Sequence, residues 1–176
     1  MRILWFTNTP SNAAGEFNFK SFGGGWISSL ETLITETGSI QLGICFFYNG
    51  SSFKKIEKQN VVYYGIPFKS GNAIQRILRP HYFKLIDEDP TNFNRVIEEF
   101  EPELIHVFGT ERGYGKILMN RPEKIVFSLQ GLLNPIDSVY FPLGFSNLKI
   151  LKESKINSII RGNTIFHDYM MLKKMA

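Results

Sequence analysis

The sequence is poor in cysteine and histidine and has no long apolar run. Cys45 is the only cysteine, which excludes a disulfide within the chain and a cysteine metal cluster. No segment approaches the roughly 20 apolar residues that span a bilayer. The chain opens directly into a strand-like run at Ile3, without a basic and apolar leader. We therefore expect a cytoplasmic protein with neither a transmembrane helix nor a metal site.

Most of the chain has no net charge, and positive charge is in excess only near its end. The formal net charge is +4. Residues 146–176 carry six Lys or Arg and two Asp or Glu, so residues 1–145 are neutral overall. Nucleic-acid-binding domains normally spread basic residues over a folded face, and we expect no nucleic-acid partner. The basic end is typical of a solvated helix, with contact to an anionic membrane surface as the alternative.

Length and apolar content set the size of the fold. A chain of 176 residues is long enough for one sizeable core and too short for two full-sized α/β domains. Hydrophobic residues make up 43% and include 16 Phe, which favours a large core over an aromatic ligand platform. We place one domain at residues 1–145 and a basic, mostly helical tail at 146–176.

Short apolar runs alternate with helical patterns in the first domain. Such runs are typical of parallel strands that are buried on both faces. The expected strands are 2–7, 41–48, 61–66, 104–108 and 125–129, and the expected helices begin near Trp26, Pro90 and Tyr114. The pattern predicts an α/β fold, a doubly wound, mainly parallel Rossmann-like sheet with helices on both faces. One apolar face of the first helix is expected from Trp26, Ile27, Leu30, Leu33 and Ile34.

The loop before the first helix ends in Gly23, Gly24 and Gly25, and Trp26 follows. Glycines let backbone amides approach a ligand closely, and the helix that follows offers its positive end to an anion. We expect these four residues to contact a phosphate or a sugar, with a flexible hinge as the alternative. The spacing differs from a dinucleotide-binding fingerprint, because Ser28 stands where that motif has its third glycine.

Two further loops follow strands at the same expected edge of the sheet. Gly109, Thr110 and Glu111 end one strand, and Gln130 and Gly131 follow the next. Ligands collect beyond the carboxyl ends of such strands. The polar side chains of these loops suit sugar hydroxyls or a phosphate, with bonds to a helix end or to nearby backbone as the alternative.

Nothing in the sequence predicts a self-contained catalytic centre, and we assign no catalytic residue. Neither an H-x-x-x-H nor a G-x-S-x-G motif occurs. His106 lies inside an expected strand, where we predict a hydrogen-bonded core histidine rather than a base.

Four segments, in order, resemble the N-terminal domain of family 4 GT-B glycosyltransferases, most of all Bacteroidetes-type enzymes of surface polysaccharide synthesis. They are 1–10, 23–31, 105–111 and 128–132. In that family two Rossmann-like domains face each other across the reaction cleft. The N-terminal domain mainly holds the acceptor, and the C-terminal domain holds the nucleotide-sugar through an E-x7-E type motif. The anomeric configuration is retained without a metal or another cofactor.

The resemblance implies roles for particular residues. Gly24 and Gly25 would approach the donor diphosphate or the acceptor, and Gln130 stands where many members have histidine. Residues 1–145 would form the acceptor-side domain, one half of a GT-B fold, and the tail would continue toward a donor-binding domain beyond Ala176. The substrates would be a nucleotide-sugar and a glycan or lipid-linked acceptor, and the chain by itself would transfer no sugar.

Two other functions remain open from the sequence. The first is a free-standing flavodoxin-like domain that binds a nucleotide or phosphate by itself. The second is a non-catalytic interaction module.

Overall fold

The structure is a computed structural model. It describes residues 1–19, 25–67, 90–109, 114–118 and 121–129, together with residues 149, 152, 154–160, 164–167 and 169–170. The expected loop and helical pieces at 69–88 lie outside the described residues. The described part of the tail includes the short helix α8 (Ile156–Ile160), and the boundary at residue 145 stays a prediction.

A six-stranded sheet forms the centre of the fold, in the order β3-β4-β2-β1-β5-β6. The strands are β1 (Arg2–Phe6), β2 (Gln41–Tyr48), β3 (Lys54–Lys58), β4 (Val61–Pro67), β5 (Leu104–Phe108) and β6 (Lys124–Ser128). All neighbouring strands pair in parallel except β3 and β4, which are antiparallel. The predicted mainly parallel sheet is confirmed.

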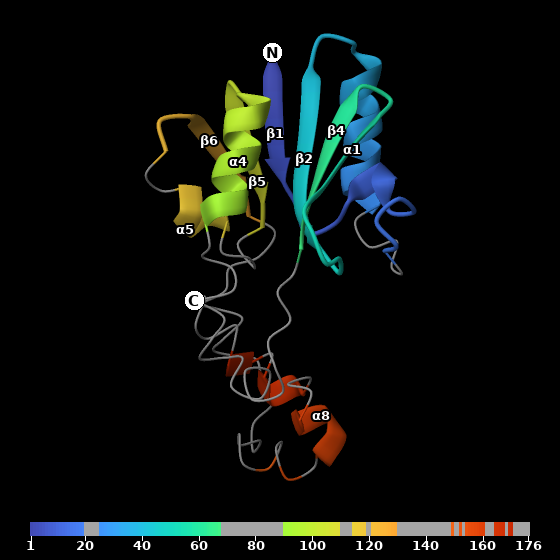
Figure 1. The fold of residues 1–176 in the computed structure, drawn as a ribbon, viewed down its shortest axis with the longest axis vertical. Helices are drawn as coiled ribbons and strands as arrows, with labels where there is room; N and C mark the ends of the chain where they lie inside the picture. The colour runs from blue at the N-terminus through green and yellow to red at the C-terminus, as the bar shows by residue number, and fades with distance from the viewer. Residues whose placement is uncertain are drawn as a thin grey trace.

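Helices cover both faces of the sheet (Figure 1). In that view α4 (Pro90–Phe100) stands in front of the sheet and α1 (Gly25–Glu36) lies behind β4. The short α5 (Tyr114–Leu118) shares the apolar core of α4. Helices on both faces of a mainly parallel sheet define a doubly wound, Rossmann-like α/β fold.

The central strand β1 divides its side chains between two cores. Leu4 and Phe6 enter the core under α4, whereas Ile3 and Trp5 enter the core under α1. All four side chains are buried because helices close both faces of the strand. This two-sided burial is the physical reason that the first strand reads as a continuous apolar run.

Strand β3 is absent from the sequence-based prediction, which has no strand between 48 and 61. It forms a hairpin with β4 through Gln59 and Asn60, whose φ angles are +52° and +63°. Two positive φ values in succession are typical of a tight hairpin turn. Its KKIEK sequence is mostly charged, as suits an edge strand, and it lacks the apolar run that marks the other strands.

The predicted apolar face of α1 is partly wrong. Ile27 is buried and Leu30 and Ile34 are partly buried, as expected, but Trp26 is 49% exposed and Leu33 is 61% exposed. The helix is rotated so that Glu31 faces the sheet and is buried. A buried carboxylate needs hydrogen-bond donors, and the site described below supplies them.

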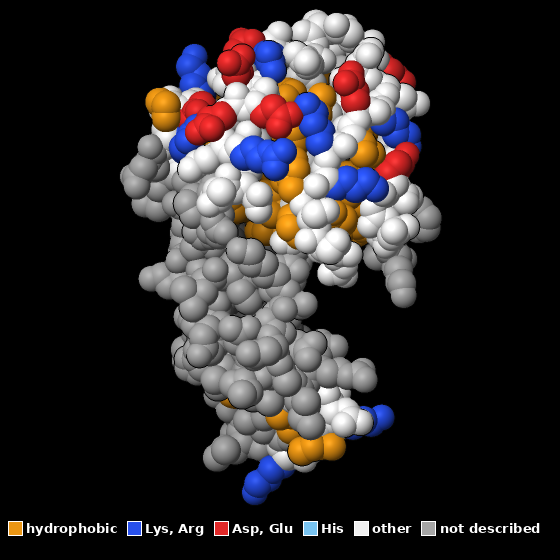
Figure 2. All heavy atoms as spheres, in the orientation of Figure 1, with side chains coloured by type: hydrophobic (Ala, Val, Ile, Leu, Met, Phe, Trp, Pro, Cys, Tyr) orange, Lys and Arg blue, Asp and Glu red, His pale blue; other side chains and the backbone are white. Residues whose placement is uncertain are grey.

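The surface of the sheet domain carries both signs of charge. On the face drawn in Figure 2, Lys and Arg side chains lie among Asp and Glu side chains. Lys55 and Glu99, for example, form an ion pair between β3 and α4. Among the described residues, no helix is both long and apolar enough to cross a membrane.

A substitution at Gly43 tests how closely β2 packs against the core under α4. A Cβ at this position would stand 3.0 Å from Leu4 Cδ1 and 3.0 Å from Phe100 Cε2. We expect Gly43→Ala to lower the free energy of unfolding by about 1–3 kcal/mol, because overpacking forces neighbours to shift. Urea unfolding measures this change in the free energy of unfolding. Gly15→Ala is the control, since a Cβ there meets nothing within 4 Å. Equal stability of the two variants would contradict the packing described.

Candidate functional site

The carboxyl ends of the parallel strands meet at one edge of the sheet, the lower edge in Figure 1, where α1 begins. From β1 the chain proceeds to β2 and β4 on one side, and then returns to β5 and β6 on the other. The point between β1 and β5 is therefore the topological switch point of the sheet. Ligands of open α/β sheets bind outside the carboxyl ends of strands at such a point.

Aromatic rings form the floor of this edge. Trp26, in the first turn of α1, lies against Phe108 at the end of β5, with ring centroids 5.4 Å apart. Trp5 of β1 also contacts Phe108, with ring centroids 5.0 Å apart. Phe108 is fully enclosed, whereas Trp26 keeps about half of its surface open. The edge therefore presents an accessible indole on a rigid aromatic support.

His106 and Ser128 connect β5 to β6 beside these rings. The His106 Nε2 and Ser128 Oγ atoms are 2.7 Å apart, and the imidazole packs on Phe108 with centroids 3.9 Å apart. Burial lowers the pKa of His106 below its ordinary value of 6.5. The predicted hydrogen bond of His106 inside the strand is confirmed, although the side chain is half-buried rather than fully in the core. Its neutral form is favoured.

Backbone contacts hold the strand ends in place. Gly109 has φ +84°, in the left-handed region that favours glycine, and its N–H donates to the Ser128 carbonyl oxygen at 2.9 Å. The buried Tyr114 hydroxyl donates to the Thr7 carbonyl oxygen at 3.0 Å and so ties α5 to the end of β1. These bonds position the ends of β1, β5 and β6 relative to one another.

Three of the predicted site residues lie at this edge. Gly25 begins α1, Trp26 contacts Phe108, and Gly109 follows β5. The other predicted residues lie outside the described residues: Gly23, Gly24, Thr110, Glu111, Gln130 and Gly131. Phe108 and Ser128 also lie at this edge but are not among the predicted site residues. Both are the last residues of their strands, and this position was a usable signal.

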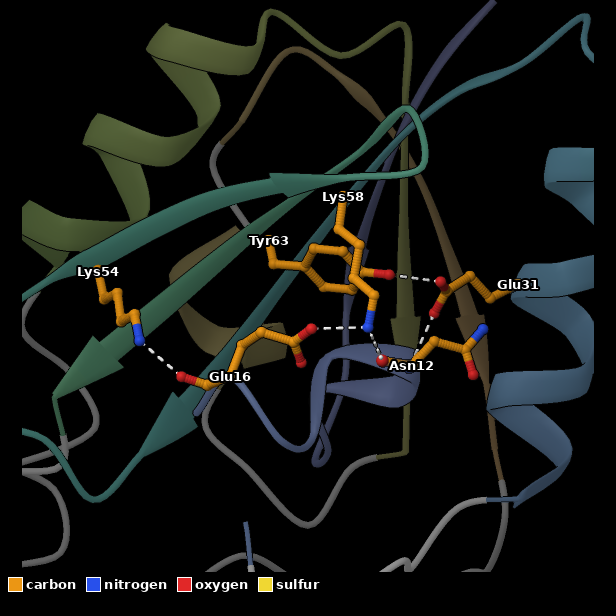
Figure 3. Close-up of polar contacts among 6 residues, drawn as sticks. All are labelled: Asn12, Glu16, Glu31, Lys54, Lys58 and Tyr63. Carbon is orange, nitrogen blue, oxygen red and sulfur yellow. Dashed lines mark hydrogen bonds and ion pairs between the residues drawn. The ribbon is translucent and has the colours of Figure 1, made fainter. Parts of the chain in front are cut away.

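A polar network ties the loop after β1 to α1, β3 and β4 (Figure 3). The Glu31 carboxylate accepts one hydrogen bond from the Tyr63 hydroxyl at 2.5 Å and another from the Asn12 backbone N–H at 3.2 Å. Lys58 Nζ donates to the Asn12 carbonyl oxygen at 3.1 Å and pairs with Glu16 at 2.6 Å. One network therefore joins four elements that lie far apart in the sequence.

The network shifts the titration of its members. Burial, together with the hydrogen bond to Glu31, raises the pKa of Tyr63 far above its ordinary value. The hydrogen bond from Lys58 lowers the pKa of Glu16. At neutral pH the tyrosine is therefore a hydrogen-bond donor and Glu16 is an anion, as the observed bonds require.

The lowered pKa of His106 predicts a pH dependence of stability. A folded-state pKa below 6.5 means that the unfolded chain binds the proton more readily. The contribution of His106 is therefore complete above pH 6.5 and is lost as the pH falls through the folded-state pKa. We expect His106→Gln, which can still bond to Ser128, to flatten the decline in the free energy of unfolding between about pH 7.5 and about pH 5. Parallel declines in both proteins would refute this.

Tyr63→Phe tests the buried network. The change leaves one Glu31 oxygen buried without its donor, and we expect the free energy of unfolding to fall by about 1–3 kcal/mol. Tyr48→Phe is the matched control, because the Tyr48 hydroxyl bonds to the Ser52 carbonyl oxygen at an exposed position. The control should change stability by about 0.5 kcal/mol or less. Thermal and urea unfolding measure both variants, and similar values for the two would contradict a structural role for the network.

Comparison with known proteins finds little similarity. No protein-family model matches the sequence, and no curated protein matches it either. Among solved structures, the fold matches one described as trehalose-6-phosphate from E. coli bound with UDP-2-fluoro glucose, at 12% sequence identity and a TM-score of 0.40. The match covers 73% of this chain and 33% of the other, so the chain spans about a third of that protein's length. A likeness at this level assigns no family to the chain.

Proposed function

We propose that this chain is the acceptor-side part of a GT-B glycosyltransferase of the family 4 type. The whole enzyme would move a sugar from a nucleotide-sugar to a glycan or lipid-linked acceptor, with retention of configuration and without a metal. The observation that carries the proposal is the meeting of the α1 N-terminus, Trp26, Phe108 and Gly109 at the switch point of the sheet.

The start of α1 suits a diphosphate. Its first turn contains no acidic side chain, and the first backbone N–H groups of a helix have no partner within the helix. A Cβ added at Gly25 would meet none of the described residues within 4 Å. A positive helix end with this room beside it favours an anionic ligand. In the proposal, the backbone N–H groups of Gly23 and Gly24 would also approach the diphosphate.

The aromatic and apolar residues near this edge suit one wall of a cleft. Trp26, at the start of α1, and Leu129, just after β6, both keep more than two fifths of their surface open. Exposed apolar surface at a strand edge often marks a place that another surface or a ligand covers. A second domain closing over this edge would cover them and exclude water from the reaction.

In the proposal the remaining predicted residues would complete the wall. Thr110, Glu111, Gln130 and Gly131 come after β5 and β6 in the sequence and would reach sugar hydroxyls or the phosphate from the strand ends. Retaining transfer also needs charge stabilisation on the departing diphosphate and alignment of acceptor and anomeric carbon. In the proposal the donor-binding domain supplies these, the basic tail at 146–176 leads toward it or contacts an anionic membrane surface, and the protein acts in the cytoplasm.

Gly25→Asp tests the proposal with little risk to the fold. The new side chain has room, and a carboxylate in the first turn of a helix is favourable for the helix itself. It would repel a diphosphate, so we expect the rate of transfer by the enzyme that carries this chain with its donor-binding domain to fall more than about tenfold. Gly25→Asn is the matched control, since it has the same size without the charge, and it should keep most of the activity.

Sugar transfer and nucleoside diphosphate release from a panel of nucleotide-sugars are the measurements. The proposal expects both from the two-domain enzyme and neither from this chain alone. Diphosphate release by the chain alone, or equal transfer rates for Gly25→Asp and Gly25→Asn, would contradict it.

A further inference from the structure

A cavity lies at the amino-terminal edge of the sheet, the upper edge in Figure 1, where the label N marks the start of the chain. Its volume is about 410 Å³, within the range of small-molecule sites. The start of β1, the turn between α1 and β2, and the β3–β4 hairpin form its walls. The polar side chains of the lining belong to Arg2, Thr35, Ser39, Gln41, Glu57 and Asn60.

The cavity is distinct from the proposed transfer site. The parallel strands begin at this edge and end at the other, where the switch point lies. β1 runs from Arg2 to Phe6, and at about 3.3 Å per residue its two ends are about 13 Å apart. The described residues that line the cavity include none from the start of α1 or from the carboxyl ends of the strands. A ligand at this edge therefore has no part in the proposed contact with the diphosphate.

The Arg2 side chain carries a positive charge without a counter-ion among the described residues. It is half-buried, and its guanidinium carbon lies 5.0 Å from the centroid of the Phe100 ring. Arg2 Nε is buried and has no hydrogen-bond partner in the described part of the chain, and none of the ion pairs there includes Arg2. The Glu103 carboxylate accepts the Arg2 backbone N–H at 3.0 Å, not the guanidinium. Since charged side chains are rarely buried without a partner, the unpaired guanidinium indicates that an anion from outside completes this edge.

The chemistry of the lining favours a singly charged anion that also carries hydroxyl groups. A planar guanidinium matches the two oxygens of a carboxylate. Glu57 of β3 is exposed at the rim and would repel a second negative charge on the ligand. The Met1 amine also lines the cavity, but it lies 4.0 Å from the Glu103 carboxylate, which balances its charge. The side-chain amides of Gln41 and Asn60 supply donors and acceptors for ligand hydroxyls.

We propose that this cavity binds a small hydroxylated carboxylate with one negative charge, held against the Arg2 guanidinium. Packing on Phe100 already orders the guanidinium, so its side chain loses little freedom when the carboxylate binds. The bound ligand would link β1, the turn after α1 and the β3–β4 hairpin. The site stands apart from the proposed transfer reaction, because it requires only this chain and lies at the opposite edge of the sheet.

Titration of the full chain with gluconate and lactate, at constant ionic strength, tests the proposal. Backbone amide NMR shifts of Gln41 and Asn60 report binding, and sulfate serves as the doubly charged comparison. We expect saturable shifts with at least one of the two carboxylates and weaker binding of sulfate. The same carboxylate should raise the melting temperature, because a ligand that binds only the folded state stabilises it.

Substitutions of two arginines separate binding from stability. Arg2→Met keeps an apolar stem over Phe100 but removes the guanidinium, and it should weaken carboxylate binding more than about tenfold. Its melting temperature without ligand should equal or exceed that of the wild type, because the lost charge has no partner. Arg95→Met is the matched control and should bind like the wild type, since Arg95 also packs on a ring, that of Phe53 at 4.1 Å, but does not line the cavity. Glu57→Gln should tighten binding about two- to fivefold, because it removes a like charge from the exposed rim.

Absence of saturable binding for both carboxylates would overturn the proposal. So would sulfate binding as tight as that of the carboxylates, or wild-type affinity in Arg2→Met. If Arg2→Met does not fold, Arg2→Lys provides the second test: it keeps the charge but loses the planar fork, and it should bind about three- to tenfold more weakly. Wild-type affinity in Arg2→Lys would then contradict recognition by the guanidinium. Because the chain is titrated without a nucleotide-sugar, these results do not depend on whether sugar transfer is observed.

Discussion

The fold depends on the burial of β1 from every side. Its backbone pairs with β2 and β5, and its side chains alternate between the core under α4 and the core under α1. A strand in this position aligns the carboxyl ends of its neighbours, because parallel pairing sets their register. After β1 the chain first adds β2 and β4 on one side and later adds β5 and β6 on the other. This order places the switch point, with Trp26 and Phe108, directly beside β1.

The second constraint is the buried carboxylate of Glu31. Apolar patterning alone would turn Trp26 and Leu33 toward the sheet, but the Tyr63 hydroxyl and the Asn12 N–H bond to Glu31 and rotate α1 instead. The rotation leaves Trp26 half open above Phe108 on one flank. On the other flank, the same network fixes the loop after β1. One polar group therefore positions both the start of α1 and the loop after β1.

At the switch point the start of α1 lies beside an accessible indole. A helix start favours an anionic group, and an indole favours an apolar or ring-shaped one. This combination is consistent with the proposed function.

The sequence by itself determined the parallel strands, the helices at 26, 90 and 114, and the edge where Gly25, Trp26 and Gly109 lie. These follow from local patterns, because a strand buried on both faces is apolar at every position and a glycine marks a turn. Strand β3, the rotation of α1 and the polar network around Glu31 were decided only by the tertiary structure. β3 is a charged edge strand whose partner is visible only in the hairpin. Glu31 finds its donor 32 residues away, and Lys58 meets a loop 46 residues before it. Contacts between residues so far apart leave no period or motif in the chain, so no local pattern could have predicted them.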